Sequence, residues 1–542
     1  MSILNRPFEA LAATAGASPD ELKLIFSFLL SYPLAGLLKR VPDSKPWLKN
    51  VFIVSTAAFY LVGLFDFWDG IRTLAISAGG TYAIAKYLKT SPYMPWVGFV
   101  FLMGHMSISH IHRQIAATPS VVDITGAQMV LVMKLNSFCW NIADGQVAAE
   151  QLSDSQRDRS LKELPALLDY TAYILFFPSL FAGPAFDFVD YQRWIDTSMF
   201  DVPSGVDPSK KPPVRKKRKI PRSGTPAMIK AAAGLAWLGL FMALSPHFSF
   251  EELTSDSYLD YGFIRRVWIM YMVGVVTRLK YYGVWTLTEG ACILAGLGYN
   301  GVDPVTGKVS WNRLQNIDPF MVEFAQNPRA YLGGWNMNTN HWLRNYIYLR
   351  VTPRGKKPGF RASMFTFVTS ALWHGFYPGY YLTFMLASLV QTAAKHFRRH
   401  VRPFFLDPVT GKPSSRKRYY DFVSYVVTQI TFCFVTAPFL VLTFRGSILA
   451  WSRVYFYAVV WTVAALGFFS SPGKKALTKQ LENYQGKANV KLVRTVSTES
   501  LTGGHPILGI SKDPERDITE AVEELRAEVE ALQRGPGGKK ED

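Results

Sequence analysis

A histidine inside an apolar stretch is the first side chain in this sequence that could do chemistry. Residues 370–375 read Ser-Ala-Leu-Trp-His-Gly, which places His374 among apolar neighbours. An ionisable group at membrane depth is costly to bury and is therefore a functional candidate by default. Histidine also has the pKa best suited to general-base catalysis near neutral pH. We expect Gly375, Pro378 and Gly379 to break the helix and open space beside His374, which a purely structural histidine would not need.

A second candidate is a segment dense in amide and indole groups. Residues 333–344 read Gly-Gly-Trp-Asn-Met-Asn-Thr-Asn-His-Trp-Leu-Arg. Asparagine and tryptophan donate hydrogen bonds without carrying charge, so they suit polarising a carbonyl or holding an oxyanion in a dry site. The alternative is a capped helix start at a membrane interface, where tryptophan is common. Asn336, Asn338 and Asn340 exceed what a cap requires, and any of the three could be the partner of His374.

Basic residues follow this segment: Arg344, Arg350, Arg354, Lys356 and Lys357. A phosphate-bearing co-substrate such as coenzyme A would need such a cluster. The excess of Lys and Arg in cytoplasmic loops of membrane proteins explains it equally well, so both interpretations stay open.

Other catalytic patterns are not evident. His105, His110 and His112 lie close together, but no nearby carboxylate or cysteine completes a metal site, and we expect none. The sequence shows no nucleophile elbow and no Walker-type glycine loop. The three cysteines each lie in an apolar run and fit neither a disulfide framework nor a zinc site: Cys139, Cys292 and Cys433.

The elements that must position these residues are long apolar runs. The chain has 542 residues, and only 18% are charged, below the roughly 25% of soluble domains. An apolar helix of about 20 residues crosses a hydrocarbon core of about 30 Å. We therefore predict an all-α, polytopic membrane protein. The candidate spans are about 22–38, 51–66, 71–88, 94–112, 126–142, 168–186, 227–246, 264–282, 284–299, 362–396, 420–444 and 452–471.

Two of these runs are unusual. The run 126–142 contains Lys134, Asn136 and Asn141, which predicts a re-entrant or interior helix, because polar groups facing lipid are costly. The run 362–396 is too long for one simple span and contains Pro378-Gly379, so we expect two helices or one broken helix.

The charge is +19, from 59 Lys and Arg against 40 Asp and Glu. In a membrane protein this excess is typical of cytoplasmic loops near anionic lipid. The basic loop 201–225 resembles a nuclear-import signal, but among apolar spans it indicates membrane lipids, not nucleic acid, as the partner.

Composition divides the chain into three parts. Residues 1–20 form an N-terminal segment that ends in a helix start, Ser18-Pro19-Asp20-Glu21, with the pattern of a capping box. Residues 21–472 hold the apolar runs. Residues 473–542 form a polar tail in which a short amphipathic helix begins near Asp517 and offers a packing face or a weak partner site. Lys539-Lys540, close to the end, look like a dilysine retrieval signal of the endoplasmic reticulum, which predicts a cytosolic tail.

Four motifs together resemble the membrane-bound O-acyltransferase family, and within it the lysophospholipid acyltransferases of the fungal broad-specificity type. The resemblance covers roughly residues 20–470. The motifs are Gly183-Pro184-Ala185 with Asp190, Tyr191 and Trp194; Asp123-Ile124-Thr125-Gly126 with Gln128 and Lys134; Trp335-Asn336 through Trp342-Leu343-Arg344; and Trp373-His374-Gly375 with Pro378, Gly379, Tyr380 and Tyr381.

The resemblance implies roles for single residues. It makes His374 and Asn336 the catalytic pair and gives His341 no catalytic role. It places substrate-binding residues at Trp335, Asn338, Asn340, Trp342, Arg344, Trp373, Asp123, Gln128 and Lys134, with no metal. It also implies roughly 11 transmembrane helices ringed around a central reaction chamber.

The implied activity is transfer of a fatty acyl group from acyl-CoA, as co-substrate, to the free hydroxyl of a lysophospholipid. We expect acyl-CoA from the cytosol, the acceptor from the membrane, and a multi-pass protein of the endoplasmic reticulum that could form oligomers. The same chemistry on diacylglycerol, a sterol or a protein is an alternative. A transporter with His374 in a proton relay is less favoured, because transporters often carry broken helices in matching positions and only one break is evident here.

Overall fold

The computed structural model describes residues 5–15, 18–116, 122–201, 219–352, 360–408 and 411–485. The regular secondary structure in these ranges is helical, with no β-strand beyond two isolated bridges. The predicted all-α class is confirmed. The longer helices are α1 (Asn5–Ala15), α2 (Pro19–Leu38), α3 (Pro46–Ala58), α4 (Trp68–Tyr87), α5 (Met94–Ile115), α6 (Thr125–Asp144), α8 (Leu167–Ile174), α9 (Phe188–Ile195), α10 (Gly224–Leu244), α11 (Phe263–Ala295), α15 (Phe360–His374), α16 (Pro378–His396), α17 (Lys417–Val441), α18 (Phe444–Ser452), α19 (Tyr457–Ser470) and α20 (Pro472–Gln485).

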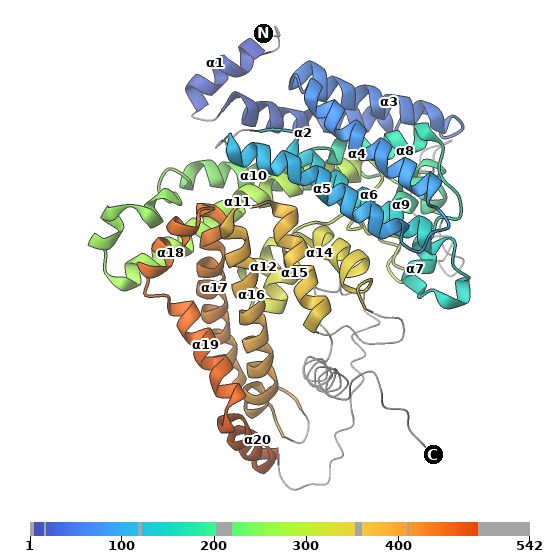
Figure 1. Ribbon diagram of the computed structural model, residues 1–542. Coiled ribbons are helices and arrows are strands. Elements are labelled where there is room, and N and C mark those ends of the chain that lie inside the picture. Colours follow the sequence, from blue (N-terminus) through green and yellow to red (C-terminus); the bar gives the residue numbers. More distant parts are fainter. Residues whose placement is uncertain are drawn as a thin grey trace, which may run out of the picture.

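Shorter helices join them. These are α7 (Asp154–Arg159), α12 (Pro319–Glu323), α13 (Pro328–Gly334), α14 (Met337–Leu343) and the π-helices η1 (Phe59–Leu64) and η8 (Arg344–Tyr348). Figure 1 shows α3, α4, α5 and α6 along one end of the molecule, and α16, α17 and α19 running away from it as a second group. The capping box at the start of α2 is present as predicted, with Ser18 accepting from the Glu21 N–H.

Helix α6 lies inside the protein, as its polar residues predicted. Nearly all of its side chains are buried. Asn136 accepts a hydrogen bond from the Trp342 indole at 3.0 Å, and Asn141 accepts one from the Tyr346 hydroxyl at 3.0 Å. Its amide groups therefore attach α14 and η8 to the interior of the fold.

Two expected spans, 264–282 and 284–299, are wrong as separate elements, because α11 runs unbroken from Phe263 to Ala295. Gly283 does not end a helix. A Cβ at this position would come within 2.5 Å of the Leu238 side chain and 3.0 Å of the Gly234 carbonyl oxygen on α10. Small residues allow two helix backbones to approach closely in membrane proteins, and Gly283 and Gly234 do this here.

The expected span 168–186 is also wrong. Helix α8 ends at Ile174, and a short 3₁₀ turn at Phe177–Ser179 follows before an extended segment. Pro178 and Pro184 lack the N–H that a continuing helix would need.

The predicted break in 362–396 is confirmed, but its glycines do not open space. Gly375 has φ +127°, and a Cβ there would lie 3.2 Å from the His110 ring nitrogen Nδ1. A Cβ on Gly379 would lie 2.0 Å from the Pro438 carbonyl oxygen. Both glycines instead allow α5 and α17 to pack tightly against the junction of α15 and α16.

Within the described ranges, four helices are long and apolar enough to cross a membrane alone: Pro19–Leu38, Pro46–Leu64, Gly224–Leu244 and Lys417–Val441. A fifth span results if the bent pair of α18 and α19 is counted as one. The chain is thus a membrane-type helical protein, whereas the count of roughly 11 spans stays a prediction. Most of the basic loop (202–218) and the tail beyond Gln485, with its expected helix and dilysine, lie outside the described residues.

Candidate active site

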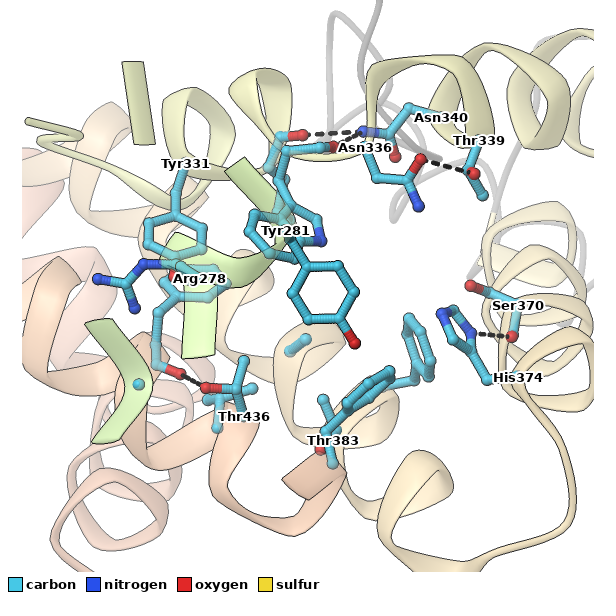
Figure 2. A pocket seen from close by; sticks show the side chains of 18 of the residues that line it. Arg278, Tyr281, Tyr331, Asn336, Thr339, Asn340, Ser370, His374, Thr383 and Thr436 are labelled. Carbon is cyan, nitrogen blue, oxygen red and sulfur yellow. Dashed lines mark hydrogen bonds between the residues drawn. The ribbon is translucent and has the colours of Figure 1, made fainter. Parts of the chain in front are cut away.

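An apolar cavity of about 150 Å³ lies between α11, α15, α16, α17 and the segment 331–340. Figure 2 shows the His374 imidazole and the Asn336 amide extending into it from two different elements. The sequence places these residues 38 positions apart, and the fold brings them to one cavity. Other lining residues include Arg278, Tyr281, Tyr331, Trp335, Thr339, Asn340, Ser370, Thr383, Phe384, Gln391, Thr436 and Phe439.

His374 is the last residue of α15, and its imidazole is fixed by its own helix. The ring nitrogen Nδ1 lies 2.7 Å from the Ser370 carbonyl oxygen. A carbonyl oxygen can only accept, so Nδ1 carries the proton and the neutral ring keeps a lone pair on Nε2. Three aromatic rings surround the imidazole at centroid distances of 5.1–5.7 Å: Tyr380, Phe384 and Phe439. The histidine therefore has the tautomer and the surroundings of a general base.

Trp373, directly before the histidine, is held from two sides. Its indole N–H donates to the Met129 carbonyl on α6 at 3.0 Å. Its carbonyl oxygen accepts from Nε2 of the buried His110 on α5 at 3.1 Å. These bonds fix the end of α15 and so determine where His374 points.

The three asparagines of the segment 336–340 differ in what their amide N–H groups do. Asn340 donates to the carbonyls of Leu332 and Trp335, both at 2.8 Å. Asn338 donates to Asn316 at 3.1 Å, on the side away from the apolar cavity. Asn336 instead accepts through Oδ1 from the Thr339 hydroxyl at 2.8 Å, which turns its Nδ2 group toward the cavity (Figure 2). This pattern favours Asn336 as the amide that meets a ligand.

Asn336 also has an unusual backbone. It precedes α14 with φ +44° and ψ +56°, in the left-handed region. Asparagine tolerates this region better than other residues with a side chain, and glycine adopts it freely.

A second cavity, of about 210 Å³ and polar, lies on the other side of α14. Thr339 and Asn340 of this short helix line the apolar cavity, whereas Asn338, His341 and Trp342 line the polar one. The polar cavity also contains three arginine–aspartate pairs: Arg159–Asp187 at 3.0 Å, Arg193–Asp158 at 2.8 Å and Arg313–Asp190 at 2.8 Å.

Two of these carboxyl groups differ electrostatically. The hydrogen bond from Arg193 is the main cause that lowers the pKa of Asp158, so this carboxylate stays ionised. Burial raises the pKa of Asp187, although the charge of Arg159 opposes the shift. The cavity thus presents guanidinium groups next to partly compensating carboxylates.

A sequence profile of the membrane-bound O-acyltransferase family matches residues 117–437, more than half of the chain. The chain belongs to this family. A protein named lysophospholipid acyltransferase from Schizosaccharomyces pombe is 42% identical over 481 residues, which cover 89% of this chain and 92% of that protein. A Saccharomyces cerevisiae protein of the same name is 40% identical over 533 residues, covering 96% and 86%. Lysophospholipid acyltransferase 2 of Arabidopsis thaliana is 29% identical over 462 residues, covering 84% and 94%.

Within this membrane-bound O-acyltransferase, the expected substrate-binding residues divide into three groups. Trp335 and Asn340 line the apolar cavity with the proposed catalytic pair, and Asn338, Trp342 and Lys134 line the polar cavity. Trp373, Arg344, Asp123 and Gln128 line neither.

The residues outside both cavities have structural contacts. Asp123 accepts from the Thr125 backbone N–H and hydroxyl at the start of α6. Gln128 lies 3.3 Å from the His105 ring, and Arg344 donates to Asn345. Arg350, one of the basic residues that could have formed a phosphate-binding cluster, makes a bidentate salt bridge with Asp144 on α6. It lines neither cavity. Arg354, Lys356 and Lys357 lie outside the described residues.

Several lining residues were not expected from the sequence. In the apolar cavity these are Arg278, Tyr281, Thr383 and Gln391, and in the polar cavity Arg159, Asp187 and Arg313. Among the described residues, no group of three or more His, Cys, Asp or Glu side chains is arranged to hold a metal ion.

Proposed function

We propose that this chain is an acyl-CoA-dependent lysophospholipid O-acyltransferase. The single observation that carries the proposal is the meeting of His374 and Asn336 at one apolar cavity, with Nδ1 of the histidine bonded to the Ser370 carbonyl. Relatives covering most of the chain are named for this activity. This geometry supports His374 as the base and Asn336 as the amide donor in a largely apolar cavity.

The chemical step begins at the free hydroxyl of the acceptor. Nε2 of His374 accepts the hydroxyl proton as the oxygen attacks the thioester carbonyl carbon. The tetrahedral oxyanion accepts a hydrogen bond from Nδ2 of Asn336. When the intermediate collapses, the carbon–sulfur bond breaks, and the coenzyme A thiolate leaves and takes up the proton from the histidine. No acyl-enzyme is needed, because the two substrates meet directly.

Acyl-CoA has a polyanionic end and an apolar end, and the two cavities on either side of α14 match this division. We propose that the polar cavity holds phosphate groups of coenzyme A and that the thioester reaches His374 past α14. A guanidinium has five N–H donors and one carboxylate occupies at most two, so the paired arginines can still bind phosphate.

The polar cavity can be tested at Arg193, which is partly exposed and pairs with an exposed carboxylate. Arg193→Gln should raise KM for acyl-CoA about tenfold with kcat little changed, because a hydrogen bond to a charged group is worth about 1.5 kcal/mol. Arg72→Gln, at an exposed pair outside both cavities, should leave KM unchanged. Steady-state kinetics on detergent-purified protein measures both. An unchanged KM in Arg193→Gln would remove this cavity from the acyl-CoA path.

His110 provides a test of how His374 is positioned. His110→Leu removes the donor to the Trp373 carbonyl and should lower kcat about 10²-fold, because small displacements of a catalytic group have effects of this size. KM for both substrates should stay within about twofold of the wild type. His110→Gln keeps an N–H donor and should recover most of the rate. His112→Leu, exposed on the same helix, is the control. Equal losses in the Leu and Gln variants would contradict a positioning role.

The function itself is tested with a panel of acceptors. Purified protein should form ester from acyl-CoA with lysophospholipids and not with diacylglycerol, a sterol or a peptide. A preference for diacylglycerol, a sterol or a peptide would be compatible with the proposed acyl transfer but would reject a lysophospholipid as the acceptor.

We also propose that the protein resides in the endoplasmic reticulum membrane with its tail in the cytosol, supported by the resemblance of Lys539-Lys540 to a dilysine retrieval signal. Protease should remove the tail from sealed microsomes, and protection of the tail would reject this topology.

A further inference from the structure

Two buried hydrogen-bonding groups in the apolar cavity have no partner within the described protein. They are the hydroxyl of Thr383 and the amide nitrogen Nε2 of Gln391, whose residues are 6% and 5% exposed. A buried polar group without a partner is unfavourable and rare in native structures. Both side chains line the cavity, so a ligand in the cavity is the partner that can satisfy them.

The two groups lie on one stripe of α16 that begins beside the catalytic histidine. Thr383, Ala387 and Gln391 are four residues apart and line the cavity from one helix face. The ring of Phe384, next to Thr383, is 5.1 Å from the His374 ring. Gln391 lies eight residues further, about 12 Å along the helix axis. The stripe therefore leads away from the reacting centre.

The facing wall has polar residues whose hydrogen bonds are already made. Arg278 binds Glu323 through two bonds of 2.7 Å, and this carboxylate also accepts from the Tyr282 hydroxyl. On the same wall, the Thr277 and Thr436 hydroxyls donate to carbonyl oxygens of their own helices. Besides the proposed pair of His374 and Asn336, these contacts leave Thr383 and Gln391 as buried groups of this cavity that a ligand atom can satisfy.

The missing partner of Gln391 must carry a hydrogen-bond acceptor. The Gln391 Nε2 group is a donor only, so it requires an acceptor atom. A fatty acyl tail has none along its length, and packing one against Gln391 would leave the donor buried and unpaired. A lysophospholipid carries oxygen atoms on its glycerol and on its headgroup, next to the hydroxyl that reacts.

We propose that Thr383 and Gln391 recognise the acceptor lipid: Thr383 binds an oxygen of the glycerol region near His374, and Gln391 binds an oxygen of the phosphate-bearing headgroup. This inference rests on the proposed function and assigns the acceptor's place within the same cavity. It also assigns the acyl tail of acyl-CoA to a position away from this stripe.

The test uses full-length purified protein with Thr383→Val, Gln391→Leu and Thr392→Val. Thr392 is the matched control, because it neighbours Gln391, lies outside the cavity lining and donates to the Ser388 carbonyl. The probes are lysophosphatidylcholine, monoacylglycerol and acyl-CoAs of several chain lengths. Wild-type turnover of lysophosphatidylcholine is measured first, and its absence would reject the proposed function independently of this inference.

Gln391→Leu should lower kcat/KM for lysophosphatidylcholine about tenfold and leave monoacylglycerol within about twofold, because only the former has a phosphate headgroup. Thr383→Val should lower kcat/KM for both acceptors by a similar factor. KM for acyl-CoA and the chain-length preference should not change, and Thr392→Val should match the wild type. Thermal stability should not fall in either cavity variant, because each removes an unpaired buried group.

Two results would overturn the inference. One is unchanged acceptor kinetics in both cavity variants. The other is a shift in acyl-chain preference with unchanged acceptor kinetics, which would show that the stripe contacts the acyl tail of the donor.

Discussion

Replacing His374 with alanine should reduce acyl transfer by about 10²–10⁴-fold, the usual effect of losing a general base. The structural reason is that Nε2 carries the only lone pair of the ring that can accept a proton, because Nδ1 donates to the Ser370 carbonyl. The loss should appear in kcat, measured with both substrates saturating. Equilibrium binding of acyl-CoA should be retained, because the imidazole moves a proton and does not hold the co-substrate.

Two controls separate this role from a structural one. His396→Ala, at the far end of α16 and outside the cavity lining, should keep near-normal turnover. His374→Gln fills the site without supplying a base and should be as inactive as the alanine variant. Both His374 variants should elute as the wild type does in size-exclusion chromatography. Near-normal turnover in a folded His374→Ala protein would overturn the mechanism.

The second large effect is expected at Asn336. Losing one oxyanion donor typically lowers the rate about 10²–10³-fold, and Asn336→Ala should show a loss of this size. Alanine also fits poorly at φ +44°, at a cost of about 1–2 kcal/mol. The alanine variant alone therefore mixes a chemical effect with a backbone effect.

Asn336→Gly separates these effects, because glycine adopts the left-handed conformation without strain. If the amide acts on the oxyanion, the glycine variant should be stable and still about 10²-fold slower than the wild type. Paired measurements of kcat and melting temperature decide the question. Recovery of activity in Asn336→Gly would show that the residue serves only the turn before α14.

Much of the fold follows from local sequence patterns. The start of α2 is determined by its capping box, and the separation of α15 from α16 by Gly375 and Pro378. The predicted helix boundaries are wrong where contacts with other helices determine whether a helix ends or continues. Gly283 could end a helix or allow a close approach, and only its contact with Gly234 on α10 shows which. The interior position of α6 could be predicted because Lys134 and two asparagines would be costly in lipid.

The site was predictable only in part. His374 and Asn336 could be singled out as candidates because their residue types are unusual in apolar surroundings, and the structure places both at one cavity. Arg278 and Glu323 are 45 residues apart and meet through tertiary packing, so no local pattern reveals the pair. Thr383 and Gln391 look like ordinary polar residues of a helix. Their spacing of eight places them on one face, but that this face lines a cavity depends on α11 and α17.

The most direct measurement of the central claim follows both products of one reaction. Purified protein is mixed with radiolabelled acyl-CoA, first alone and then with lysophospholipid, and labelled phospholipid, free thiol and labelled protein are quantified. Direct transfer at the His374–Asn336 cavity predicts labelled phospholipid and free thiol in equal amounts, both dependent on the lysophospholipid, with no labelled protein. Thiol release with stable labelling of the protein before the acceptor is added, or no labelled phospholipid at all, would contradict the account.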